Sequence, residues 1–96
     1  MAFQDKLTLL SGATTTGSAV RLDSYGYWNW VTYGTFNSSS AQLQWSPDNT
    51  TFISVDGAAV TADGGFSEVP IGAGYVRVAI TGTATSVNSQ LDRVSR

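Results

Sequence analysis

Residues 25–36 read Tyr-Gly-Tyr-Trp-Asn-Trp-Val-Thr-Tyr-Gly-Thr-Phe, and this aromatic run decides the fold class. Successive side chains of a β-strand point to opposite faces. As a strand, the stretch has aromatic residues on both faces: Trp28, Trp30, Thr32 and Phe36 on one, and Tyr27, Asn29, Val31 and Tyr33 on the other. A sandwich strand normally buries one face and leaves the other in water. Three explanations of the outer face stay open: the tyrosines half cover a loop while their hydroxyls stay in water, a protein partner covers the face, or the face is a flat platform on which sugars stack.

The composition predicts one small domain with few charges. Its 96 residues suit a single core, which we expect to involve the chain from residue 1 to residue 96. Only 12% of the residues are charged, about half the usual share, while Ser and Thr together make up a quarter of the chain. The net charge of -2 has the wrong sign for phosphate backbones or anionic lipid, so we expect no direct nucleic-acid partner.

The residue types that are missing exclude most common catalytic chemistry. Without Cys or His, the chain offers no thiolate nucleophile, disulfide, Cys/His zinc site or Ser-His-Asp triad. Several of the seven acidic residues have turn roles that explain them, and no calcium-loop spacing occurs among them. We therefore expect no enzymatic activity, no metal and no cofactor.

Targeting signals are also missing from the sequence pattern. The apolar stretches are short, and residues 1–6 lack the basic and hydrophobic regions of a signal peptide. We expect no membrane span and no secretion signal, with the product kept in a cytoplasm at least until assembly or lysis.

Short β-branched and aromatic runs, separated by turn residues, predict an all-β fold. We expect a single antiparallel β-sandwich of about 7–9 short strands, either jelly-roll-like or immunoglobulin-like. The expected strands cover residues 3–10, 18–22, 27–36, 41–46, 51–55, 58–62, 65–69, 75–81 and 86–94.

Three turn motifs divide the middle of the chain. Ser46-Pro47-Asp48-Asn49 has the chemistry of a type I turn and predicts a hairpin. Asp56-Gly57 and Asp63-Gly64 each place a residue that tolerates positive φ beside a glycine, which is typical of tight hairpin loops. Residues 51–69 are accordingly predicted to be a run of short antiparallel strands.

A second strand supplies polar candidates. In residues 41–46, Trp45 shares a face with Ala41 and Leu43, and core placement is the default for it. Gln42 and Gln44 share the other face, where they suit either carbohydrate hydroxyls or a hydrogen-bonded subunit contact.

The chain resembles small β-sandwich virion proteins of tailed bacteriophages, over about two thirds of its length. The residues that carry this resemblance are Tyr33-Gly34-Thr35-Phe36, the strand pair around Ser46-Pro47-Asp48-Asn49, and the strand that begins Gly72-Ala73-Gly74-Tyr75-Val76-Arg77. Similar hairpins also occur in discoidin-like and other carbohydrate-binding sandwiches.

The resemblance implies a non-enzymatic capsid decoration or cement protein. Its implied partners are the major capsid protein or other virion subunits, and the implied oligomer is a trimer. The alternative is a carbohydrate-binding module or a receptor-binding tail or fibre accessory, with Trp28, Trp30, Tyr27 or Tyr33 stacking on a glycan. Residues 1–6 are a candidate contact arm, and the interface candidates are Phe3, Tyr25, Tyr27, Trp28, Trp30, Tyr33, Gln42 and Gln44.

Overall fold

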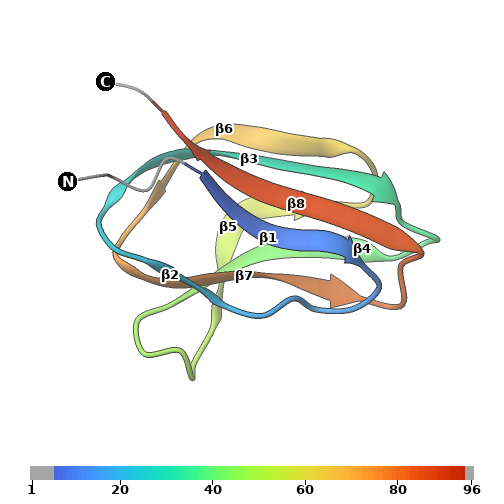
Figure 1. The fold of residues 1–96 in the computed structure, drawn as a ribbon, viewed down its shortest axis with the longest axis horizontal. Coiled ribbons are helices and arrows are strands. Elements are labelled where there is room, and N and C mark those ends of the chain that lie inside the picture. Colours follow the sequence, from blue (N-terminus) through green and yellow to red (C-terminus); the bar gives the residue numbers. More distant parts are fainter. Residues whose placement is uncertain (1–5, 95–96) are drawn as a thin grey trace.

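The computed structural model describes residues 6–94, which form eight β-strands and no helix. The strands are β1 (Lys6–Ala13), β2 (Val20–Leu22), β3 (Gly26–Thr35), β4 (Ser40–Ser46), β5 (Ile53–Val60), β6 (Gly64–Ile71), β7 (Gly74–Thr81) and β8 (Ser86–Arg93). They make two antiparallel sheets that pack face to face (Figure 1). The predicted all-β sandwich is therefore confirmed.

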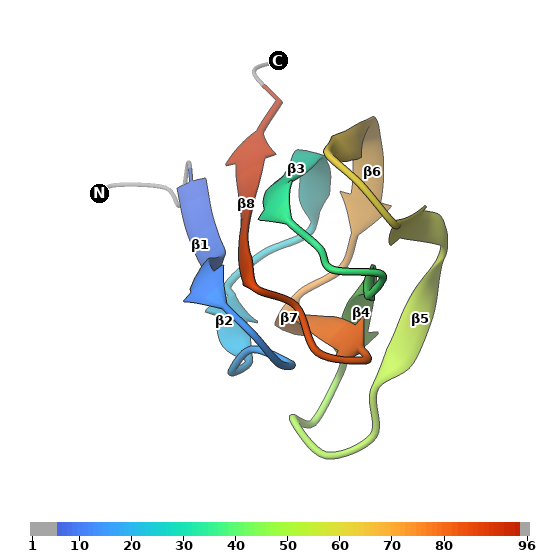
Figure 2. The ribbon, with the colours of Figure 1, turned by 90° about the vertical axis from the view of Figure 1, so that its right-hand side faces the viewer.

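The strand order identifies the sandwich as a jelly roll. The first sheet has the order β1-β8-β3-β6 and the second sheet has the order β2-β7-β4-β5 (Figure 2). Only β4 and β5 are joined within one sheet; every other connection crosses to the opposite sheet. Of the two topologies that the sequence left open, this order is that of an eight-stranded jelly roll.

The core lies between the two sheets and follows the period-two pattern of the strands. In β3 the buried residues are Trp28, Trp30 and Thr32, as the alternation predicts, and Phe36 just beyond the strand is buried with them. The fully buried apolar side chains of the other strands meet them from both layers: Leu22, Leu43, Val76, Val78, Val87 and Leu91.

The three turn motifs have three different outcomes. Ser46-Pro47-Asp48-Asn49 begins the hairpin between β4 and β5, as predicted, and Asp48 Oδ1 accepts hydrogen bonds from Thr50 N and Thr51 N, each at 3.0 Å. Asp63-Gly64 does not close a hairpin, because β5 and β6 belong to different sheets. The chain crosses from one layer to the other at this point.

Asp56-Gly57 is not a turn but a bulge inside β5, so the two strands predicted at residues 51–55 and 58–62 are one strand. The pairing of β4 with β5 shifts between Gln42 and Gln44, and Gly57 takes a φ of 77°. A bulge of this kind adds residues to one strand without ending it. The positive φ that the Asp-Gly pair predicts is present, but the chain continues in the same direction.

The edge strands of both sheets are irregular. At the edge of the first sheet, β6 contains Pro70 and a bulge at Glu68, which has a φ of 53°. The opposite edge strand β1 has shifted register around Gly12. The second sheet ends in the bulged β5 on one side and in the three-residue β2 on the other. Such interruptions reduce the pairing of exposed edges with other chains.

Candidate functional site

The outer face of the first sheet carries the exposed aromatic side chains of β3. Tyr27, Val31 and Tyr33 are 38%, 38% and 46% exposed, and Asn29 between them is half-buried. The sequence assigns these four residues to one face, and the structure confirms that assignment. Tyr25, just before the strand, is 59% exposed.

Polar side chains of β8 flank this aromatic row. Asp92, Gln90 and Asn88 are the register partners of Asn29, Val31 and Tyr33. Gln90 donates from Nε2 to Asp92 Oδ2 at 2.9 Å. The outer face therefore combines tyrosine rings with amide groups and the Asp92 carboxylate.

Trp28 and Trp30 do not belong to this surface, which corrects their place among the interface and sugar-stacking candidates. Both indoles are fully buried because their strand positions point into the core. Trp30 donates from Nε1 to Ser89 Oγ at 2.7 Å, and the Arg93 guanidinium lies 4.5 Å from the centre of the Trp28 ring. The two tryptophans hold the sandwich together and present no ring to a partner.

Gln42 and Gln44 have contacts within the chain, on the outer face of the second sheet. Gln42 Nε2 lies within 3.0 Å of the carbonyl oxygens of Leu43, Val55 and Ala58, two of which belong to the bulged part of β5. Gln44 Oε1 accepts from Arg77 Nε at 2.8 Å. Both side chains therefore have hydrogen-bond partners within the second sheet, in β4, β5 and β7.

Tyr25 and Tyr27 form an aromatic pair at the end of the first sheet where β3 begins. Their ring centres are 5.8 Å apart and their planes meet at 80°, an edge-to-face arrangement. A hydrogen bond with Tyr27 raises the pKa of the Tyr25 hydroxyl above its ordinary value of 10.0. Pro70 is exposed and is the register partner of Tyr27. We call Tyr25, Tyr27 and Pro70 the tyrosine patch.

A hollow of about 540 Å³ lies along the middle of β3, between β3 and β6. Asn29, Val31 and Tyr33 line it from β3, and Asp63, Gly64, Gly65 and Ser67 line it from the β6 side. Sequence reasoning missed this site because it assigned Asp63-Gly64 to a hairpin turn. The second glycine, Gly65, was the available signal, since a turn of that kind does not require it.

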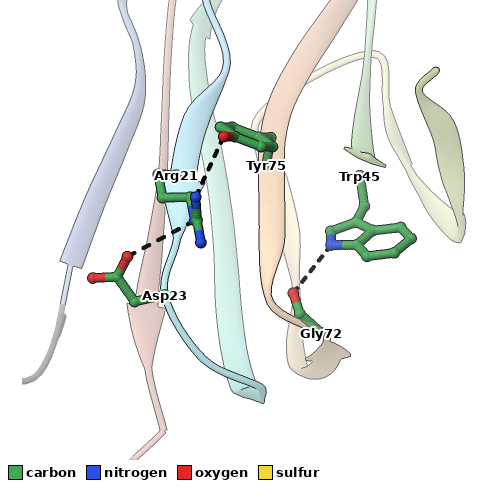
Figure 3. Close-up of polar contacts among 5 residues, drawn as sticks. All are labelled: Arg21, Asp23, Trp45, Gly72 and Tyr75. Atoms are coloured by element: carbon green, nitrogen blue, oxygen red, sulfur yellow. Dashed lines mark hydrogen bonds and ion pairs between the residues drawn. The ribbon is translucent and has the colours of Figure 1, made fainter. Parts of the chain in front are cut away.

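The second sheet presents arginines stacked on aromatic rings. Arg21 lies 5.3 Å from the ring centre of Tyr75, donates to the Tyr75 hydroxyl at 3.3 Å, and approaches Asp23 at 4.0 Å (Figure 3). Arg77 lies 4.0 Å from the ring centre of Phe52. Such stacking orders the guanidinium groups against the sheet.

Trp45 lies near the end of β4, close to these stacked side chains. Its indole Nε1 donates to Gly72 O at 3.0 Å, which ties β4 to the connection between β6 and β7 (Figure 3). The ring is partly buried and packs against the core, in agreement with the default placement.

Phe3 and most of the candidate arm lie outside the described residues. Among the side chains that the structure describes, no three Asp or Glu come together as metal ligands, and no helix of the described residues is long and apolar enough to cross a membrane. No protein-family model matches the chain, and comparisons with curated proteins and with solved structures likewise find no match.

Proposed function

We propose that this chain is a non-enzymatic structural protein of a phage virion, a decoration or cement protein that attaches to the head surface through the tyrosine patch. The observation that carries this proposal is the exposed pair Tyr25 and Tyr27, which is 59% and 38% accessible at one end of the first sheet. The partner is the major capsid protein or another virion subunit. The trimeric state rests on the resemblance to small virion sandwiches.

Aromatic side chains suit such a contact because they are enriched at the centres of protein interfaces. Pro70 lies across from Tyr27 and adds a rigid apolar neighbour. The patch contains no ionised side chain, so covering it leaves no buried charge without a partner. A subunit that attaches in many copies needs only a modest affinity at each contact.

The fold is compatible with this role. Jelly rolls are used by viral capsid domains and also by lectins. Because one fold serves many functions, the argument depends on the patch and not on the topology alone.

Co-sedimentation with undecorated heads of the phage that encodes the chain tests the proposal. We expect the wild-type chain to pellet with the heads, and Tyr27→Ala to reduce the bound fraction while the thermal midpoint stays nearly unchanged. Tyr33→Ala, at the opposite end of the same strand, is the matched control and should bind like wild type. A wild-type chain that stays in the supernatant at high concentration would falsify the attachment.

A further inference from the structure

The hollow beside Tyr33 contains none of the three residues of the tyrosine patch. Tyr27 and Tyr33 are six residues apart on one strand, which corresponds to about 20 Å along β3. The volume of about 540 Å³ lies in the usual range of small-molecule sites. A chain that is attached through Tyr27 near the start of β3 would still expose Tyr33 near the end of the same strand.

Two glycines of β6, Gly64 and Gly65, line the hollow with backbone alone. Gly65 pairs with Val31, and a Cβ atom added to Gly65 would lie 1.9 Å from Trp30 O. Gly64 pairs with Thr32, and a Cβ atom there would make an ordinary contact of 3.5 Å with Val60 Cγ1. The absence of a side chain at Gly65 therefore lets β6 pair closely with β3 beside the hollow.

Two groups at its margin are placed to make hydrogen bonds with a ligand. Asp63 Oδ1 accepts from Gly34 N at 2.9 Å, and no contact within residues 6–94 engages the second oxygen, Oδ2. Asn29 Oδ1 accepts from Glu68 N at 3.0 Å, which leaves the side-chain NH₂ as a donor. The Asp63 carboxylate is thus fixed by the fold while retaining an acceptor.

Tyr33 supplies an aromatic wall. Its ring is 46% exposed and borders the hollow on the β3 side. An aromatic ring with a solvent-exposed hydroxyl packs well against the C–H face of a pyranose. The hydroxyls of the sugar then extend from the rim of its ring toward polar groups. Val31 continues this apolar surface along the strand.

The charge of the lining selects among polar ligands. The lining contains the Asp63 carboxylate and no Lys or Arg, which disfavours phosphates and acidic sugars. Carboxylates accept two hydroxyl hydrogen bonds readily, and neighbouring sugar hydroxyls can donate them.

We propose that the hollow binds an uncharged saccharide, with Tyr33 stacked on the apolar face of one sugar ring and Asp63 accepting its hydroxyl groups. Asn29 donates to a further sugar oxygen. The chain would then carry a glycan-binding site along β3 and its attachment surface where that strand begins. This inference stands independently of the virion attachment.

Titration of the isolated chain with methyl glycosides, followed by NMR, tests the proposal. The panel consists of the glycosides of glucose, galactose, mannose, rhamnose and N-acetylglucosamine, with sialic acid as the charged comparison. At least one neutral glycoside should shift the amide resonances of Asp63, Gly64 and Gly65 with a millimolar Kd, and sialic acid should not.

Three variants of the site and one control variant distinguish a loss of binding from a general effect on folding. Tyr33→Ala should weaken binding about tenfold, and Tyr33→Phe should retain most of it because the ring remains. Asp63→Asn keeps an oxygen for Gly34 N but loses the charge, so it should weaken binding without lowering the thermal midpoint. Tyr25→Ala, in the tyrosine patch, is the control that should bind like wild type.

The proposal is overturned if no neutral glycoside shifts these resonances, or if Tyr33→Ala binds as well as wild type. Either result leaves the virion attachment unaffected, because that contact is measured with phage heads and the Tyr27→Ala variant.

Discussion

The side-chain amide of Gln42 donates to the carbonyl oxygen of Ala58 at 2.9 Å, across the bulge that interrupts β5. Carbonyl groups freed by a bulge must find other partners, because a buried polar group without one is costly. Gln42 supplies that partner from the neighbouring strand. A side chain that the sequence offers for an intermolecular contact is thus part of the sheet itself.

Replacing Gln42 with Ala should therefore destabilise the fold. The carbonyl oxygens of Val55 and Ala58 would lose their shared donor, and we expect the free energy of unfolding to fall by about 1–2 kcal/mol. Urea denaturation measures this change. Gln90→Ala on the outer face of the first sheet is the control, with an expected change of less than about 0.5 kcal/mol. Equal stability of both variants would contradict the structural role of Gln42.

Replacing Ser89 with Ala should lower the free energy of unfolding by more than the removal of one small hydroxyl group suggests. The buried Ser89 hydroxyl accepts from Trp30 Nε1 at 2.7 Å and lies 2.9 Å from Thr32 Oγ1. Its removal leaves a buried indole N–H without an acceptor, which predicts a loss of about 1–3 kcal/mol. Chemical denaturation measures the free energy of unfolding, with Ser54→Ala at an exposed position as the control. A decrease for Ser89→Ala no larger than that for Ser54→Ala would be evidence against this network.

Gly65→Ala should disturb the pairing of β3 with β6. Because the added Cβ would lie 1.9 Å from Trp30 O, the two strands would have to move apart. We expect the free energy of unfolding to fall by about 1–3 kcal/mol. Gly64→Ala is a matched control, since its Cβ would make an ordinary contact of 3.5 Å with Val60 Cγ1. We expect a lowered thermal midpoint for Gly65→Ala alone. Similar midpoints for the two variants would show that the strands adjust freely.

The hairpin between β4 and β5 should respond to acid through Asp48. Hydrogen bonds from Thr51 N, Thr50 N and the Ser46 hydroxyl hold the pKa of the Asp48 carboxyl below its ordinary value of 3.8. A lowered pKa in the folded chain means that this contribution to stability is present above pH 3.8 and is lost as the pH falls through the lowered value. NMR titration of the Asp48 carboxyl carbon should find a midpoint below 3.8. In Asp48→Asn, unfolding experiments should show a weaker acid dependence.

Local alternation predicted the strands that have regular partners. The two faces of β3 and the buried positions of β7 follow directly from period-two patterning, since both strands are paired on each side. Ser46-Pro47-Asp48-Asn49 was recognised because the turn is made by its own side chains.

Features that depend on a distant partner were not predictable in the same way. An Asp-Gly pair favours positive φ, but whether the chain then reverses or bulges depends on the neighbouring strand, and at Gly57 that neighbour is β4 with Gln42. The site beside Tyr33 was missed for a similar reason. Asp63 and Tyr33 are thirty residues apart in the sequence, and only the pairing of β3 with β6 brings them to one hollow.

The buried hydroxyls of Thr32 and Ser89 have a consequence for the fidelity of folding. In a sheet of Val and Leu alone, neighbouring strands can slip by two residues and still bury apolar side chains. Here a slip of β8 against β3 would move Ser89 away from the Trp30 indole and leave polar atoms unsatisfied in the core. The indole and the two hydroxyls thus penalise misaligned pairings and favour a single alignment of the two central strands.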